Sequence, residues 1–260
     1  MSEKTLQIAN ITGFIAVIVT NALANALPIA GRTTGEVADQ YPNLFTPAGI
    51  TFSIWGVIYL ALLIFILLQS RGLFSDRPVP EYVASIGPLF VVNCLLNVSW
   101  ILVWHQLWVI PSVLIMLGLL ATLYLIYQRV QGYSWRGFGL IRLPFSLYFA
   151  WICVATIANL TVLLVDVGYQ GAPLSPPVWT AVMVGIAALL GLFFLLQEDD
   201  PVFPLVIIWA LIGIILKLRA SFDYTFAPIV VALVGIGLLV AGDLWRVIRY
   251  FSRWRLRTSK

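Results

Sequence analysis

The sequence predicts an all-α integral membrane protein with eight transmembrane helices. The chain is 61% hydrophobic and only 10% charged, whereas charged residues make up about 25% of an ordinary soluble domain. It also contains a series of long apolar stretches, and a helix needs about 20 such residues to cross a bilayer core about 30 Å thick. The basic residues, finally, are distributed very unevenly among the connecting segments. These three observations predict the fold class without any motif.

The apolar stretches define eight expected helices, taken in chain order. The first lacks the small-residue cleavage pattern of a signal peptide and exceeds the length of a typical signal core, so we interpret it as a retained helix. Pro47 precedes the second, at a position where a missing backbone N–H costs nothing. Very short breaks separate the third from the fourth (Trp104 to Trp108) and the sixth from the seventh (Glu198 to Pro201). The expected helices cover about residues 8–30, 49–69, 83–105, 108–128, 140–165, 177–197, 202–219 and 226–248.

The basic residues indicate how the eight helices are oriented. With a cytoplasmic N-terminus, only Arg32, Lys217 and Arg219 lie outside. The twelve other Lys and Arg residues lie inside: Lys4, Arg71, Arg77, Arg129, Arg136, Arg142, Arg246, Arg249, Arg253, Arg255, Arg257 and Lys260. Cytoplasmic loops of membrane proteins carry such an excess of positive charge. We therefore expect a multi-pass protein of the cell membrane with both termini in the cytoplasm.

The expected organisation has three parts. Residues 1–170 would form a five-helix membrane domain, and residues 171–248 would form an additional three-helix membrane segment packed on it. Residues 249–260 would form a basic cytoplasmic tail. Because this tail mixes arginines with aromatic residues beside a spanning helix, it is typical of a segment that lies on anionic lipid. The expected partners are therefore the lipid bilayer and no nucleic acid.

Catalytic and metal-binding patterns are missing from the predicted helices. No ionisable residue lies convincingly at a helix centre, where such groups usually mark a functional site. Cys94 and Cys153 fall inside expected helices without a Cys/His cluster, which favours buried thiols over a disulfide or a zinc site. His105, the only histidine, falls in a short outside loop, where we expect it to be solvated. The sequence therefore predicts no catalytic residue, no metal and no enzyme.

Aromatic and amide side chains recur at helical spacing in several of the expected helices. Helix 49–69 carries Phe52, Trp55 and Tyr59 on one face. Two amides, Asn21 and Asn25, lie one turn apart in helix 8–30. The remaining stripes are Asn93, Asn97, Trp100 and Trp104 in helix 83–105, and Tyr148, Trp151, Ala155 and Asn159 in helix 140–165.

Each stripe alone has an ordinary structural explanation. Amides link membrane helices by hydrogen bonds, and Trp and Tyr anchor helices at the headgroup level. Asn97, Trp100 and Asn159, however, lie well inside their helices. Several aromatic faces with a few amide groups describe an apolar pocket with sparse polar groups, which is the usual composition of a small-molecule site.

Three motifs in these stripes resemble a known family. They are Pro47-Ala48-x-x-x-Phe52-x-Ile54-Trp55-x-x-Ile58-Tyr59, Asn97-x-x-Trp100 and Trp151-x-x-x-Ala155-x-x-x-Asn159. In this order they resemble the tryptophan-rich sensory protein / translocator protein (TspO/MBR) family, over about residues 8–166. The three helices after residue 170 lie outside that resemblance.

The resemblance implies a five-helix TspO-like bundle with a ligand pocket among helices 8–30, 49–69, 83–105 and 140–165. The ligand-binding residues implied are Phe52, Trp55, Tyr59, Asn97, Trp100, Trp151, Ala155 and Asn159. Family ligands include porphyrins, other tetrapyrroles and sterols, so the ligand expected here is a tetrapyrrole or sterol-like molecule rather than a cofactor. Family members are commonly dimers, which makes a homodimer the implied assembly.

The loop from Pro28 to Pro47 is the longest outside connection, and loops of this length without their own structure are uncommon unless functional. We expect it to form a lid in which Asn43 and Phe45 approach the ligand. Three functions stay open: a binding or sensor protein, a transporter for an apolar or aromatic solute, and an intramembrane enzyme. Many transporters contain an internal repeat, and none relates residues 1–130 to residues 131–260. An enzyme needs a reactive constellation that the expected helices lack. A sensor is therefore favoured.

Overall fold

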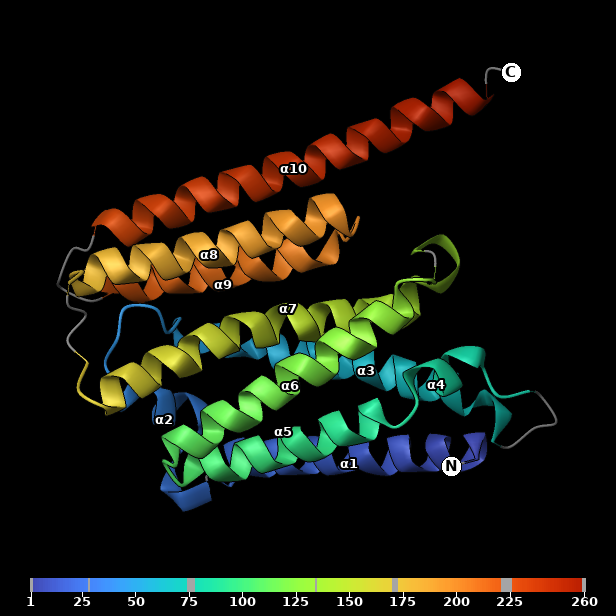
Figure 1. Cartoon of the computed structure of the whole chain (residues 1–260), viewed down its shortest axis with the longest axis horizontal. Coiled ribbons are helices and arrows are strands. Elements are labelled where there is room, and N and C mark those ends of the chain that lie inside the picture. Colours follow the sequence, from blue (N-terminus) through green and yellow to red (C-terminus); the bar gives the residue numbers. More distant parts are fainter. Residues whose placement is uncertain are drawn as a thin grey trace. The chain divides into compact units, whose positions relative to one another are not determined.

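The computed structural model describes residues 2–27, 29–73, 78–133, 135–169, 173–220 and 226–258, with side chains except those of 135–138 and 250–258. In these ranges the chain is helical and contains no strand (Figure 1). The first half forms α1 (Glu3–Ala26), η1 (Ile29–Gly31), α2 (Thr34–Asp39), η2 (Gly49–Ser53), α3 (Ile54–Gln69), η3 (Ser70–Gly72), α4 (Glu81–Ile86) and α5 (Leu89–His105). The second half forms α6 (Val109–Val130), α7 (Trp135–Asp166), α8 (Pro176–Gln197), α9 (Val202–Ala220) and α10 (Phe226–Thr258).

Seven helical stretches in the described residues are long and apolar enough to cross a membrane. They are Glu3–Ala26, Gly49–Gly72, Val109–Val130, Gly139–Asp166, Pro176–Gln197, Val202–Ala220 and Phe226–Arg249. The apolar helix α5, with 17 residues, is just shorter. These elements confirm the predicted all-α membrane fold, with a helix count close to the predicted eight.

The chain divides into two compact units. Residues Met1–Asn43 and Phe52–Tyr169 form the first, and residues Leu44–Thr51 and Gln170–Lys260 form the second. The short segment Leu44–Thr51 therefore belongs to the second unit although its neighbours on both sides belong to the first.

The first unit is a closed ring of five long helices. Helix α1 contacts α5, α5 contacts α6, α6 contacts α7, α7 contacts α3, and α3 closes the ring on α1. Figure 1 shows α1 and α5 side by side. Three phenylalanines pack inside this ring: the ring centroid of Phe65 lies 5.4 Å from that of Phe90 and 4.9 Å from that of Phe145. Tilted and edge-on aromatic contacts of this kind add to the stabilisation from area burial.

The ends of several elements differ from the sequence prediction for identifiable reasons. Helix α1 begins at Glu3, before the expected residue 8, because the Ser2 side chain accepts a hydrogen bond from the Thr5 N–H and caps the helix. The expected helix 83–105 is interrupted where Gly87 adopts a φ of 59°, a conformation that glycine tolerates readily. This break separates α4 from α5, and Pro88 follows it.

The C-terminal helix is longer than predicted. Its backbone stays helical to Thr258, so most of the expected basic tail continues α10 instead of leaving it at residue 248. Arg249 lies 4.9 Å from the ring centroid of Trp245, a cation–π contact one turn apart. The side chains of the tail from Tyr250 onward lie outside the described part of the chain. The same holds for the side chains of Arg77 and Arg136, which were expected on the cytoplasmic side.

The second unit packs α8, α9 and α10 against one another. Small residues allow close contact between α8 and α10: a Cβ added to Gly235 would lie 2.9 Å from the Cβ of Ala188. Asp200 caps α9 by accepting hydrogen bonds from the N–H groups of Val202 and Phe203. Phe194 and Phe203 stack across this turn with ring centroids 4.1 Å apart. Close backbone approach at small residues is a common packing mode of membrane helices.

Candidate ligand-binding cavity

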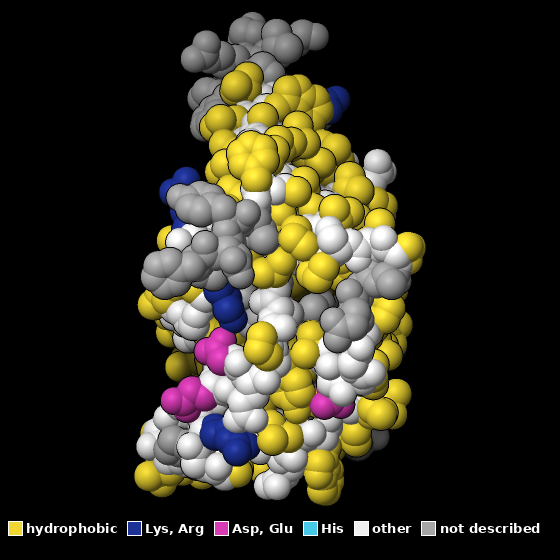
Figure 2. Space-filling model, turned by 90° about the vertical axis from the view of Figure 1, so that its left-hand side faces the viewer, with side chains coloured by type: hydrophobic (Ala, Val, Ile, Leu, Met, Phe, Trp, Pro, Cys, Tyr) yellow, Lys and Arg dark blue, Asp and Glu magenta, His cyan; other side chains and the backbone are white. Residues whose placement is uncertain are grey.

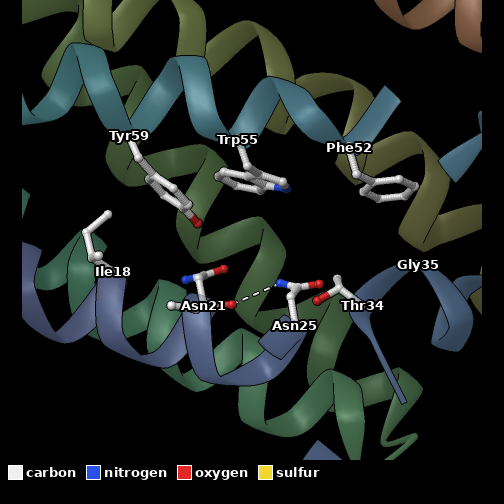
Figure 3. Close-up of a pocket in the computed structure, with 9 residues that line it drawn as sticks. Ile18, Asn21, Asn25, Thr34, Gly35, Phe52, Trp55 and Tyr59 are labelled. Carbon is white, nitrogen blue, oxygen red and sulfur yellow. Dashed lines mark hydrogen bonds between the residues drawn. The ribbon is translucent and has the colours of Figure 1, made fainter. Parts of the chain in front are cut away.

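The first unit contains a cavity of about 410 Å³ between α1, α2 and α3 (Figure 3). One wall is aromatic and comes from η2 and α3. The opposite wall comes from α1 and carries two amides, and the start of α2 contributes a third side. The lining residues are Ile18, Asn21, Ala22, Asn25, Thr34, Gly35, Phe52, Trp55 and Tyr59.

The aromatic wall follows from helical spacing. Phe52, Trp55 and Tyr59 are three and four residues apart, so their side chains point to one face, and Figure 3 shows all three directed toward α1. The rings of Trp55 and Tyr59 stack with centroids 5.4 Å apart and an interplanar angle of 23°. Stacking restricts both rings and presents a broad apolar surface to the cavity.

A second layer of aromatic residues from α7 supports this wall. Trp151 meets Trp55 edge-on at 6.3 Å and Phe52 edge-on at 6.1 Å, measured between ring centroids. Tyr148 meets Trp55 in the same manner at 5.6 Å. Trp151 is only 2% exposed, and its indole N–H has no hydrogen-bond partner in the part of the chain that the structure describes. A buried indole N–H usually finds a partner, so Trp151 supplies an unused donor directly behind the aromatic wall.

The amide wall is held by hydrogen bonds from its side-chain N–H groups, and within the described residues its side-chain oxygens take part in none. Asn21 donates to the Val17 carbonyl and to Oδ1 of Asn97, both at 2.9 Å. Asn25 donates to the Asn21 carbonyl at 2.9 Å, as drawn in Figure 3. Because an amide has two N–H donors and one oxygen acceptor, both side-chain donors of Asn21 are used in hydrogen bonds within the protein. The side-chain oxygen is the polar group that it offers to a ligand.

Tyr59 provides the opposite kind of polar group. Its hydroxyl is buried and forms no hydrogen bond of normal geometry among the described residues, and the Asn97 side chain is near enough to interact with it. In Figure 3 this hydroxyl points from α3 toward the amide side of the cavity. The cavity thus combines an apolar aromatic surface with amide acceptors on one side and a phenolic donor on the other.

Five of the predicted ligand-binding residues do not line the cavity. Asn97 contacts the lining residue Asn21, from which it accepts a hydrogen bond, and it donates to the Tyr148 hydroxyl at 2.7 Å. Trp151 lies behind the aromatic wall, and Ala155 on α7 is half-buried outside the lining. The other two, Trp100 and Asn159, are joined by a hydrogen bond of 3.2 Å from the Trp100 indole N–H to Asn159 Oδ1. Asn159 also donates to Ser112 on α6 at 3.0 Å, so this pair links α5, α6 and α7.

The connection between α1 and α3 contains a short helix, α2, where a loop without helical structure was expected. Helix α2 is fixed by a capping box: the Glu36 N–H donates to the Thr33 hydroxyl, and the Thr33 N–H donates to the Glu36 carboxylate. The Trp104 indole N–H donates to the Thr34 carbonyl at 3.2 Å and attaches α2 to α5. The pattern Thr-x-x-Glu is a recognised sign of a helix start, so this element could have been found.

The two predicted lid residues lie elsewhere in this connection. Asn43 donates to the Tyr41 carbonyl at 2.8 Å, and Phe45 is fully buried in the segment that belongs to the second unit. Neither lines the cavity, whereas Thr34 and Gly35 of α2 do. Glu36 and Asp39 of α2 are exposed, and Figure 2, which faces this end, shows acidic and basic side chains there among hydrophobic ones.

The prediction of a solvated His105 is wrong. His105 is the last residue of α5 and is only 1% exposed. Its Nδ1 lies 2.8 Å from the Ile101 carbonyl oxygen, and no described residue forms a hydrogen bond with its Nε2. Helix α5 ends at His105, where the predicted helix 83–105 ends, so the residue belongs to the helix and not to the loop, and its imidazole is buried there. Within the described residues, no three His, Cys, Asp or Glu side chains are grouped as they would be to hold a metal.

The fold and the cavity define a polytopic helical membrane protein with an aromatic and amide-lined cavity between α1, α2 and α3. A family model described as TSPO-like protein matches residues 7–245. The chain therefore belongs to the TSPO-like protein family, which confirms the resemblance found in the motifs. The match extends beyond the predicted residues 8–166 and includes α8, α9 and most of α10. No curated protein and no solved structure matches the chain.

Proposed function

We propose that this protein binds a flat, hydrophobic, aromatic or polycyclic molecule in the cavity and acts as a membrane-embedded sensor. The observation that carries the proposal is the pairing of the Phe52, Trp55 and Tyr59 wall with the amide oxygens of Asn21 and Asn25 across the cavity. Ring faces stack on aromatic side chains, and the amide oxygens accept a hydrogen bond from the edge of the ligand.

The size and polarity of the cavity support a small ligand of this class. Its volume of about 410 Å³ lies within the usual range of about 300–1,000 Å³ for small-molecule sites. Amide acceptors favour a ligand with an N–H or O–H donor at its edge. A tetrapyrrole has pyrrole N–H groups and a sterol has a hydroxyl, and both belong to the ligand classes that the family resemblance implies.

The test is a titration of the purified protein with protoporphyrin IX, followed by quenching of tryptophan fluorescence. We expect saturable quenching in the wild type and an affinity at least about tenfold lower in Trp55→Phe, which corresponds to about 1.4 kcal/mol. Trp151→Phe should weaken binding less, because Trp151 supports the wall from behind. Trp108→Phe is the matched control, since Trp108 is 59% exposed and lies away from the lining. If Trp55→Phe and Trp151→Phe both keep quenching and affinity intact, the binding site is elsewhere.

The alternative is a transporter or permease for an apolar or aromatic solute, which the three additional helices of the second unit would serve. Reconstitution in liposomes with a fluorescent tetrapyrrole separates the two functions. Saturable binding without movement of the probe across the bilayer supports the sensor, whereas flux that increases with probe concentration supports the transporter.

The predicted organisation completes the proposal. The imbalance of twelve basic residues inside against three outside supports a cell-membrane protein with both termini in the cytoplasm. We retain the division into a domain of residues 1–170, a segment of residues 171–248 and a basic tail of residues 249–260. The homodimer and the lid function of the connection between α1 and α3 also stay predictions.

A further inference from the structure

The segment Leu44–Thr51 is held by α9 of the second unit through two hydrogen bonds. The Ala48 N–H donates to the Gly213 carbonyl at 3.0 Å. The Trp209 indole N–H donates to the Thr51 carbonyl at 2.9 Å. Because Trp209 and Gly213 are four residues apart, they lie on the same face of α9. One face of α9 therefore binds both ends of the short stretch Ala48–Thr51.

The absence of a side chain at Gly213 is required for this contact. A Cβ at this position would lie 2.0 Å from Oγ1, 2.8 Å from Cγ2 and 2.9 Å from Cβ of Thr51. Real Cβ atoms do not approach other heavy atoms so closely, so any side chain would displace Thr51. Glycine within a helix is less favourable than alanine, and this close packing supplies a physical reason for its presence in the middle of α9.

The same stretch leads directly into the aromatic wall of the cavity. Thr51 and Phe52 are bonded neighbours within the single 3-10 helix η2 (Gly49–Ser53), which continues into α3. Phe52 is the first aromatic residue of the wall, and Trp55 follows three residues later. A displacement of Thr51 is therefore transmitted through about one helical turn to the residues that would contact a ligand.

We propose that α9 is a positioning element for the ligand-binding cavity: Gly213 and Trp209 hold the stretch Ala48–Thr51, and Thr51 is bonded to Phe52, the first residue of the aromatic wall. This inference rests on the proposed function and assigns a role to the second unit. If packing on α9 alters ligand affinity, ligand binding must alter that packing by the same free energy, because such coupling is reciprocal. Occupancy of the cavity would then alter the hydrogen bonds between α9 and the stretch Ala48–Thr51.

The central variant is Gly213→Ala, tested by titration with protoporphyrin IX. We expect its affinity for the probe to fall by about tenfold. Gly237→Ala is the matched control, since Gly237 also lies in a helix of the second unit and an added Cβ would meet no atom within 4 Å. The control should bind as the wild type does. Trp209→Phe, which keeps a large ring but removes the donor to Thr51, should weaken binding by a few-fold.

A complementary substitution separates positioning from a general loss of stability. In the double variant Thr51→Ala/Gly213→Ala, the two closest contacts, at 2.0 and 2.8 Å, are removed and only the Cβ contact at 2.9 Å remains. We expect this variant to recover most of the lost affinity. If Gly213→Ala alone fails to fold, the double variant and Trp209→Phe carry the test.

A readout without ligand distinguishes failure of this inference from failure of the proposed function. In a Phe52→Cys background, we expect Gly213→Ala to change the rate of thiol labelling at residue 52 relative to Gly237→Ala. The native thiols interfere little, since Cys94 and Cys153 are 4% and 8% exposed. If the wild type does not bind the porphyrin, the proposed function is contradicted and the positioning role is not. The positioning role is overturned if Gly213→Ala matches Gly237→Ala in labelling rate and, where the probe binds, in affinity.

Discussion

Asn97 shows how a single amide organises the membrane interior of this protein. Its oxygen accepts from Asn21 of α1 at 2.9 Å, and its N–H donates to the Tyr148 hydroxyl of α7 at 2.7 Å. Asn97 itself lies on α5 and is only 2% exposed. Three helices of the ring are therefore joined through one side chain directly behind the amide wall of the cavity.

We expect Asn97→Ala to lower the free energy of unfolding by about 1–2 kcal/mol, because it leaves the Asn21 donor and the Tyr148 hydroxyl without this partner. Asn25→Ala is the control, since Asn25 is exposed and donates only to its own helix. Unfolding in mixed detergent, followed by circular dichroism, measures both variants. Equal losses in the two variants would show that the link between helices contributes little.

At the scale of elements, α2 depends on its N-terminal capping box. The backbone N–H of Thr33 donates to the Glu36 carboxylate at 2.7 Å, and the Thr33 hydroxyl donates to it at 3.0 Å. These two bonds, the backbone one first, hold the pKa of Glu36 below its ordinary value. A carboxyl whose pKa is lowered in the folded state stabilises that state above its unfolded pKa, about 4.3 for Glu. The contribution is lost as the pH falls through the lower folded value.

We therefore expect hydrogen exchange in α2, corrected for its intrinsic pH dependence, to be constant between pH 7 and pH 5 and to accelerate below about pH 4. Glu36→Ala should show the faster exchange already at pH 7, because the reciprocal cap is broken. Gln40→Ala, at the other end of the same short helix, serves as the control. Unchanged exchange in Glu36→Ala would mean that the Trp104 bond to Thr34 alone holds α2.

At the scale of the whole molecule, the distribution of basic residues predicts how the helices are oriented in the membrane. The excess of basic residues on one side predicts that the connection between α1 and α3 is outside and that the turn after α6 is cytoplasmic. Gln40 and Gly132 are exposed positions in these two segments. Both native cysteines are buried, so the background labelling of an introduced cysteine is low.

We expect a membrane-impermeant maleimide to label Gln40→Cys in intact cells and to label Gly132→Cys only after the membrane is opened. The reason is that the proposed topology places the two segments on opposite sides of the bilayer. Labelling of both positions in intact cells, or of Gly132→Cys alone, would contradict the proposed topology.

The residue spacing predicts the aromatic wall of the cavity, but it does not predict the roles of the aromatic residues on α5 and α7. The spacing of Phe52, Trp55 and Tyr59 puts them on one helix face, and the structure places all three on the cavity wall. Trp151 and Trp100 have the same residue type and similar spacing, yet one supports the wall and the other bonds to Asn159. Their roles depend on the rotation of α7 and α5 within the ring, which residue spacing does not specify.

The sequence by itself determined the class of the protein, the approximate number and order of its helices, and membership in the TSPO-like family. These properties follow from long apolar stretches, charge distribution and short motifs, all of which are local. Only the tertiary structure decided which stripes meet at the cavity, that α2 forms one of its sides, and that Leu44–Thr51 belongs with α9. In a membrane both the lipid-facing and the protein-facing surfaces of a helix are apolar. Hydrophobic patterning therefore cannot show which face meets which neighbour, and only the packed helices reveal it.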